Sequence, residues 1–163
     1  MNNRKIASYG LFIALAFIFS YIESLIPIPF PVPGIKLGLA NLVVIIAIYG
    51  IGVKEALVLS VVRVLLVGFT FRDPSTILFS LAGGLLSWLS MVIFMKLKLF
   101  SMIGVSIIGG IAHNVGQIIV AILYVKNTSL IYYLPVLMIS GVISGTLIGI
   151  LGALIIKRIQ KFL

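Results

Sequence analysis

The sequence is 163 residues long; 62% of its residues are hydrophobic and only 9% are charged. Soluble domains carry roughly 25% charged residues, so this composition excludes an ordinary water-soluble fold. The net charge of +9 would suggest nucleic-acid binding in a soluble protein, but here the basic residues lie at the ends of apolar runs, as membrane anchors do. We therefore expect an all-α integral membrane protein that forms a single transmembrane domain, residues 1–163.

Four apolar segments are long enough to cross a bilayer, because a spanning helix needs about 20 apolar residues. In chain order they are 6–26, 76–95, 102–125 and 130–156. The first resembles a signal peptide, but its apolar stretch is long and it lacks a small-x-small cleavage site near Ser20. We therefore interpret it as a spanning helix.

The stretch 37–70 is apolar but is interrupted by Gly50, Gly52, Lys54 and Glu55. It divides into segments 37–51 and 56–70, each of which would reach about 22 Å at 1.5 Å per residue. The hydrocarbon core is roughly 30 Å thick. Short, glycine-interrupted segments are tolerated where they line a cavity. The sequence therefore predicts a six-helix transmembrane bundle, with four spans and one re-entrant pair as the alternative.

The basic residues divide unequally between the two sides of a six-span chain. One side holds eight of them, against three on the other, with Arg63 inside a span. The richer side carries Arg4, Lys5, Lys54, Lys96, Lys98, Lys157, Arg158 and Lys161. This bias predicts a multi-pass protein of the cell membrane with both termini in the cytoplasm.

The segment 27–34, between the first two spans, contains four of the six prolines. Alternating prolines remove backbone donors and hold a chain extended. On the outer side, such a segment suits a lid over a pocket, and it equally suits a rigid connector at the membrane surface.

Catalytic groups are scarce, because the only acidic residues are Glu23, Glu55 and Asp73 and the only histidine is His113. No carboxylate pair, metal-ligand cluster or phosphate-binding loop can be recognised. The sequence therefore indicates a protein without enzymatic activity, and we expect no cofactor and no metal.

Several polar residues lie inside or just outside the spans, at compatible depths in the membrane. A buried arginine at a helix centre costs about 2.5–3.5 kcal/mol on insertion scales, so it needs a partner or a cavity. The spacing of His113 and Gln117 places both on one helix face. We expect an outward-facing substrate pocket formed by Lys36, Asn41, Arg63, His113, Asn114 and Gln117. The alternatives are hydrogen bonds that join helices and, for Arg63, an ion pair with Glu23.

Small residues four apart let helix backbones approach closely. Gly141, Gly145 and Gly149 form a tandem G-x-x-x-G in the last span, where internal packing is the simplest interpretation. Gly10 and Ala14 form a shorter pair in the first span, where contact with a partner protein is as reasonable as packing.

The run Pro33-Gly34-Ile35-Lys36-Leu37-Gly38-Leu39-Ala40-Asn41, with Arg63 and His113-Asn114-x-x-Gln117, resembles the Gx transporter family, also labelled heptaprenyl diphosphate synthase component I. This family in turn is similar to the substrate-binding S components of energy-coupling factor (ECF) transporters. The resemblance implies six helices, cytoplasmic termini and a first loop that gates an outward pocket. It also implies docking by Gly10 and Ala14 onto a transmembrane coupling subunit driven by two ATPase subunits, although alanine is commoner in that family at the first position.

Two functions follow from the resemblance. The first is capture of a small vitamin or an isoprenoid- or quinone-precursor-like molecule for import. The second is a non-catalytic membrane subunit associated with heptaprenyl diphosphate synthesis. Prenyl transferases of the all-trans class hold magnesium with motifs such as D-D-x-x-D, and a chain whose single aspartate is Asp73 cannot build that site.

Overall fold

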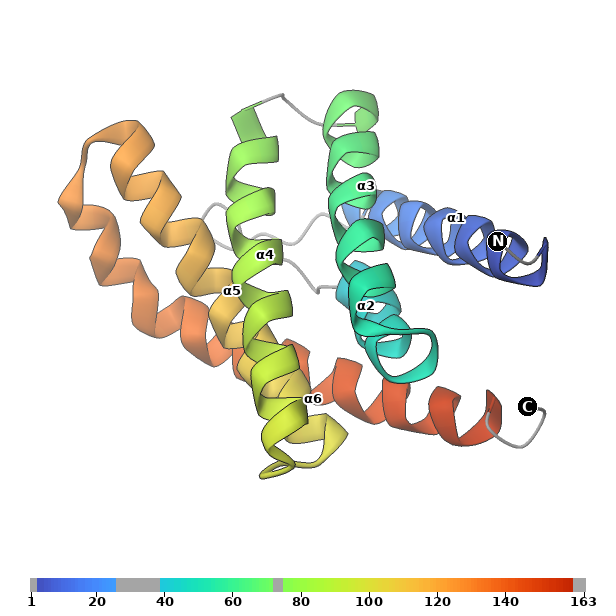
Figure 1. Cartoon of the computed structure of the whole chain (residues 1–163). Helices are drawn as coiled ribbons and strands as arrows, with labels where there is room; N and C mark the ends of the chain where they lie inside the picture. The colour runs from blue at the N-terminus through green and yellow to red at the C-terminus, as the bar shows by residue number, and fades with distance from the viewer. Residues whose placement is uncertain (1–2, 26–38, 72–74, 160–163) are drawn as a thin grey trace.

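The computed structural model describes residues 3–25, 39–71 and 75–159, and within these ranges the chain is entirely helical apart from short connections. Six α-helices and one 3-10 helix follow one another (Figure 1). They are α1 (Asn3–Leu25), α2 (Leu39–Gly50), α3 (Val53–Phe71), α4 (Ser75–Leu97), α5 (Met102–Val125), η1 (Thr128–Tyr133) and α6 (Leu134–Ile159). The predicted all-α, six-helix fold is confirmed.

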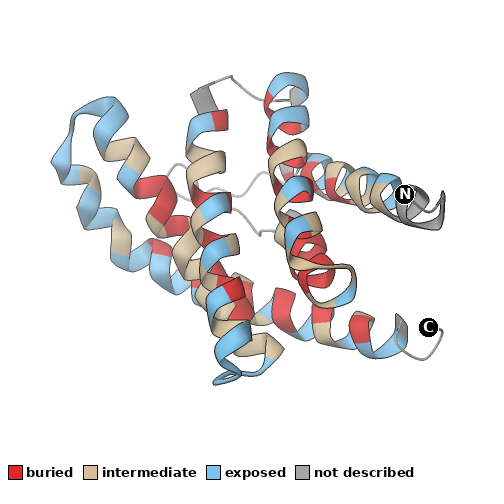
Figure 2. Cartoon of the chain, in the orientation of Figure 1, coloured by how far each residue is buried: buried red, intermediate tan, exposed pale blue. Residues whose placement is uncertain are grey.

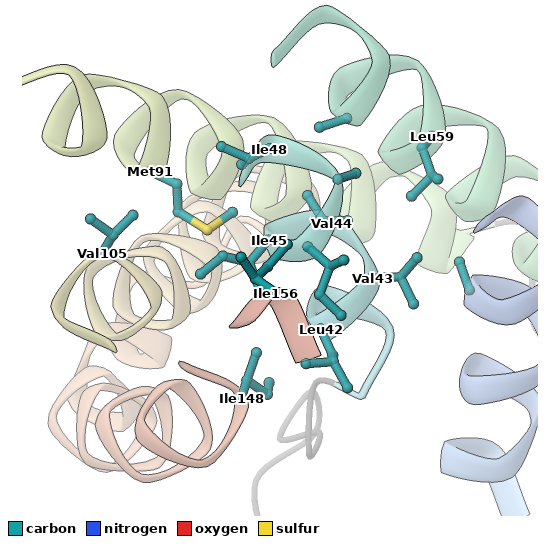
Figure 3. Close-up of a cluster of buried hydrophobic side chains, with 14 of the residues drawn as sticks. Leu42, Val43, Val44, Ile45, Ile48, Leu59, Met91, Val105, Ile148 and Ile156 are labelled. Carbon is teal, nitrogen blue, oxygen red and sulfur yellow. The ribbon is translucent and has the colours of Figure 1, made fainter. Parts of the chain in front are cut away.

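The shortest helix, α2, lies at the centre of the bundle. Every residue from Leu42 to Ile48 is buried, and α2 packs against α1, α3, α4 and α6. Figure 3 shows Leu42, Val43, Val44, Ile45 and Ile48 of α2 together with Met91, Val105 and Ile148 from the surrounding helices. A helix that is apolar on all sides is a buried helix. Its 12 residues therefore need not match the thickness of the lipid, because its neighbours surround it.

A two-residue connection joins α2 to α3. The backbone N–H groups of Ile51 and Gly52 both donate to the carbonyl oxygen of Ala47, at 2.9 Å each. The φ of Gly52 is 154°, a value that residues with a side chain rarely adopt. Because the turn is so short, Lys54 and Glu55 belong to the first turn of α3. The predicted span 56–70 is thus part of a longer helix of 19 residues.

The helices α4, α5 and α6 form the other side of the bundle, with α5 packed between the other two. A Cβ atom added to Gly145 would lie 2.7 Å from the Cα atom of Ile107, and one added to Gly149 would lie 2.7 Å from that of Ile103. Gly141 approaches Gly110 in the same way. The tandem glycine motif therefore serves internal packing between α5 and α6.

The predicted last span, 130–156, is divided in the structure. Residues Thr128–Tyr133 form the 3-10 helix, and α6 begins only at Leu134. Pro135 then occupies the first turn of α6, where its missing N–H group leaves no hydrogen bond unmade. The predicted span agrees with the apolar stretch Thr128–Arg158, but a run of apolar residues does not show that its first turns are 3-10 rather than α-helical.

Large apolar side chains cover the outside of the helices. Ile143, Leu147 and Leu154 of α6 are 55–61% exposed, and Figure 2 shows the exposed residues along the bundle. Within the part of the chain that the structure describes, three stretches are by length and composition suited to cross a membrane: Ile77–Leu97, Met102–Val125 and Thr128–Arg158. Such continuous apolar surface is unfavourable in water and matches a lipid environment. The chain is a membrane protein.

The beginning of α1 and the end of α6 lie at the same end of the bundle, beside the α2–α3 turn. The Tyr9 hydroxyl group of α1 donates to Oε1 of Glu55 at 3.3 Å. On the other side of the turn, Ile156 of α6 contacts Gly50. The beginning of α1 and the end of α6 therefore both lie beside the α2–α3 turn.

Candidate functional site

Arg63 lies near the middle of α3 and is only 9% exposed. Its Nη2 donates to Oδ1 of Asn41, on α2, over 3.4 Å, which is a long hydrogen bond. The structure therefore brings together two of the predicted site residues, from helices joined by the turn at Gly52. The amide oxygen offers Arg63 a neutral acceptor but no opposite charge.

Glu23 is also buried, at 8% exposed, near the end of α1, which packs against both α2 and α3. One turn earlier, Ser20 is buried, and its hydroxyl group donates to the carbonyl oxygen of Ala16 at 2.8 Å. An acid and a base are thus buried on adjacent helices. Whether Arg63 pairs with Glu23 stays one of the two predicted alternatives.

His113 and Gln117 lie on the face of α5 that packs against Gly83 of α4. A Cβ atom on Gly83 would lie 2.9 Å from Cγ of Gln117 and 3.0 Å from Cε1 of His113. The neighbouring Gly84 faces α3, where its Cβ atom would lie 3.2 Å from Oγ of Ser60. The two glycines therefore set how closely α4 approaches the helix with His113 and the helix with Arg63.

Asn114 points away from this face. Its Nδ2 donates to the carbonyl oxygen of Leu137 on α6 at 2.6 Å, and the side chain is 8% exposed. This buried bond joins α5 to α6. It uses the NH₂ group of the Asn114 amide as the donor. Lys36 and the proline-rich segment 27–34 lie outside the described residues, so their part in the pocket stays a prediction.

The structure adds a small cavity, lined by both polar and apolar residues, that the sequence did not indicate. It has a volume of about 10 Å³, which suits one water molecule. Asn41 lines it together with serines from three helices, Ser87 of α4, Ser106 of α5 and Ser144 of α6. Serine is common in membrane helices, so only the convergence of the four helices distinguishes these residues.

One face of α1 is left without packing. Among the described residues, nothing lies within 4 Å of a Cβ atom built on Gly10, and Ala14 is exposed. Leu11 and Ile18 on the same face are 59% and 49% exposed. The Gly10–Ala14 pair therefore does not pack against the bundle, unlike the glycines of α6.

Residues 12–155 match the family described as heptaprenyl diphosphate synthase component I. The chain belongs to this family. Its structure is similar to that of the S component of a bacterial ECF transporter, with a TM-score of 0.77 and 20% sequence identity over 99% of this chain and 98% of the other. No curated protein matches the sequence at a significant level. The predicted family and the likeness of fold to an S component are both confirmed.

Proposed function

We propose that this chain is the substrate-binding S component of an ECF-type importer and has no enzymatic activity of its own. The observation that carries the proposal is the correspondence of fold with an S component over 99% of the chain. Polar residues buried in an otherwise apolar bundle support it, because such residues in membrane proteins mark substrate pathways.

The proposed substrate site comprises Arg63 with Asn41 on one side and His113 with Gln117 on the other. Gly83 of α4 lies against His113 and Gln117, and Gly84 lies against Ser60 of α3. We propose that one ligand bridges the two groups along the small-residue surface of α4. The guanidinium group of Arg63 would bind a carboxylate or phosphate through charge-assisted hydrogen bonds. We infer a small vitamin or an isoprenoid- or quinone-precursor-like molecule with a polar or anionic end. Lys36 completes the proposed set, and Asn114 contributes from α5, where its amide also bonds to α6.

The proposed partner surface is the unpacked face of α1 that carries Gly10 and Ala14. Small residues on an exposed helix face allow another helix to approach closely. The partners would be a transmembrane coupling subunit and the two ATPase subunits that drive it. The basic end of the bundle, with Lys54, Lys157 and Arg158, would face the cytoplasm, which also places both termini there.

The direct test is to purify the chain from its native membrane in mild detergent and to identify, by mass spectrometry, small molecules and proteins that accompany it. We expect one small molecule in stoichiometric amount, together with ATPase subunits and a coupling subunit. A chain that carries no small molecule and does not co-purify with any ATPase would contradict the proposal.

The family description favours a second candidate, a non-catalytic membrane subunit associated with heptaprenyl diphosphate synthesis. This function predicts a prenyl transferase in the same purification instead of ATPases. It also predicts that adding the membrane chain changes the rate or the product length of that prenyl transferase. If the addition has no such effect, this alternative is excluded.

A further inference from the structure

A groove separates α1 from α3 at the end of the bundle beside the α2–α3 turn. Its volume is about 290 Å³, and Tyr9 and Ile13 of α1 line it together with Lys54 and Val58 of α3. Val58 is 59% exposed, so the groove opens to the surroundings of the bundle. None of its lining residues belongs to the proposed substrate site.

The lining changes from polar to apolar within one helical turn. Tyr9 and Glu55, which share a hydrogen bond, lie at the polar end. One turn further along each helix, the lining consists of Ile13, Val58 and Leu59. Because α3 begins directly after a two-residue turn between apolar helices, this change marks the boundary between the membrane interface and the hydrocarbon.

The polar end of the groove carries one basic and one acidic side chain, Lys54 and Glu55. The Glu55 carboxylate group contacts Gly52, immediately before the first residue of α3, where the helix dipole is positive, and it also accepts the Tyr9 hydroxyl. Lys54 is exposed. The last turn of α6, which carries Lys157 and Arg158, adds positive charge at the same end of the bundle.

We propose that this groove binds an anionic phospholipid, with the phosphate group at Lys54 and part of one acyl chain along Ile13, Val58 and Leu59. Basic pockets between membrane helices at a positively charged end suit anionic lipid headgroups. An acyl chain is narrow enough to lie along this apolar lining.

Native mass spectrometry of the purified full chain tests this proposal. The probes are dioleoyl phosphatidylglycerol, dioleoyl phosphatidylcholine and glycerol 3-phosphate. We expect the chain to retain the anionic lipid more than the zwitterionic one. Lys54→Gln should reduce this preference about fivefold, as expected for one interfacial lysine. Val58→Phe should fill the groove and lower retention of both lipids.

Lys126→Gln is the matched control, because this exposed lysine follows α5 at a helix end that does not line the groove. It should leave lipid retention unchanged. Equal retention of the two lipids, or equal effects of Lys54→Gln and Lys126→Gln, would overturn the proposal. Competition by glycerol 3-phosphate would point to a simple phosphate site instead. If Val58→Phe spares lipid retention but abolishes co-purification of a coupling subunit, the groove belongs to a protein interface.

Discussion

At the scale of single residues, Arg63 places a positive charge in the interior of the bundle. It is buried in mid-helix, and the Asn41 oxygen at 3.4 Å cannot neutralise its charge. A full compensation requires an anion, either Glu23 or the carboxylate or phosphate of a substrate. The two alternatives differ in what the loss of the guanidinium group does to the protein.

For the substrate alternative, we expect Arg63→Met to weaken ligand binding by about 2 kcal/mol or more, as found when one partner of a buried charge pair is truncated. The measurement is the amount of the co-purifying small molecule per protein, with thermal unfolding of the same sample. Arg158→Met, at an exposed site on α6, is the control. If Arg63→Met and Glu23→Gln each unfold the bundle, Arg63 instead forms a structural ion pair with Glu23.

Gly83 lies so close to α5 that an added side chain would collide with that helix. A Cβ atom there would lie 2.8 Å from the main-chain oxygen of His113, which cannot move without the helix. We expect Gly83→Ala to lower the free energy of unfolding by about 1–2 kcal/mol, because overpacking outweighs the gain in helix propensity.

Gly10→Ala is the matched control for Gly83→Ala. It makes the same chemical change in a helix, but at a position with open space around it. Its thermal midpoint in detergent should stay equal or rise slightly, because alanine favours the helix. If both substitutions shift the midpoint equally, the close contact between α4 and α5 at Gly83 is not important.

At the scale of the elements, α1 and α6 use similar small-residue spacing in different ways. The glycines of α6 lie against the backbone of α5, whereas Gly10 and Ala14 lie on an open face. A larger side chain at Gly145 should therefore disturb the packing of α6 on α5. A larger side chain at Gly10 or Ala14 should disturb only the binding of a partner protein to α1.

We expect Ala14→Leu to reduce transport by the assembled importer and co-purification of the coupling subunit. Ligand retention and thermal stability of the isolated chain should not change, because Ala14 is exposed. Ala14→Ser, which keeps the side chain small, should behave as the parent chain does. Unchanged transport by Ala14→Leu would remove this face from the docking surface.

At the scale of the whole molecule, the helices enter and leave the bundle at one end, and the basic residues predict which side of the membrane that end faces. The chain has no cysteine, so single introduced cysteines report topology cleanly. Ser129→Cys should react with an impermeant thiol reagent from outside the cell, and Lys161→Cys only after the membrane is opened. Labelling of both from the same side would contradict six crossings.

Much of this architecture could be predicted from the sequence, because it depends on local properties. The apolar runs predict all six α-helices to within four residues at each end, and the lack of catalytic groups indicates binding rather than catalysis. The segments 37–51 and 56–70 were predicted to be too short to cross the hydrocarbon core as lipid-facing helices. The first of them corresponds to α2. Its position at the centre of the bundle followed only from the packing of four helices around it.

Which neighbour each side chain meets was decided by the tertiary structure. His113 and Asn114 are adjacent in sequence, but one faces Gly83 of α4 and the other bonds to Leu137 of α6. Helical spacing assigns a residue to a face of its own helix, and nothing in that spacing says which helix covers the face. For the same reason, the sequence identified both small-residue motifs, and only the arrangement of the helices showed that one is packed and the other is open.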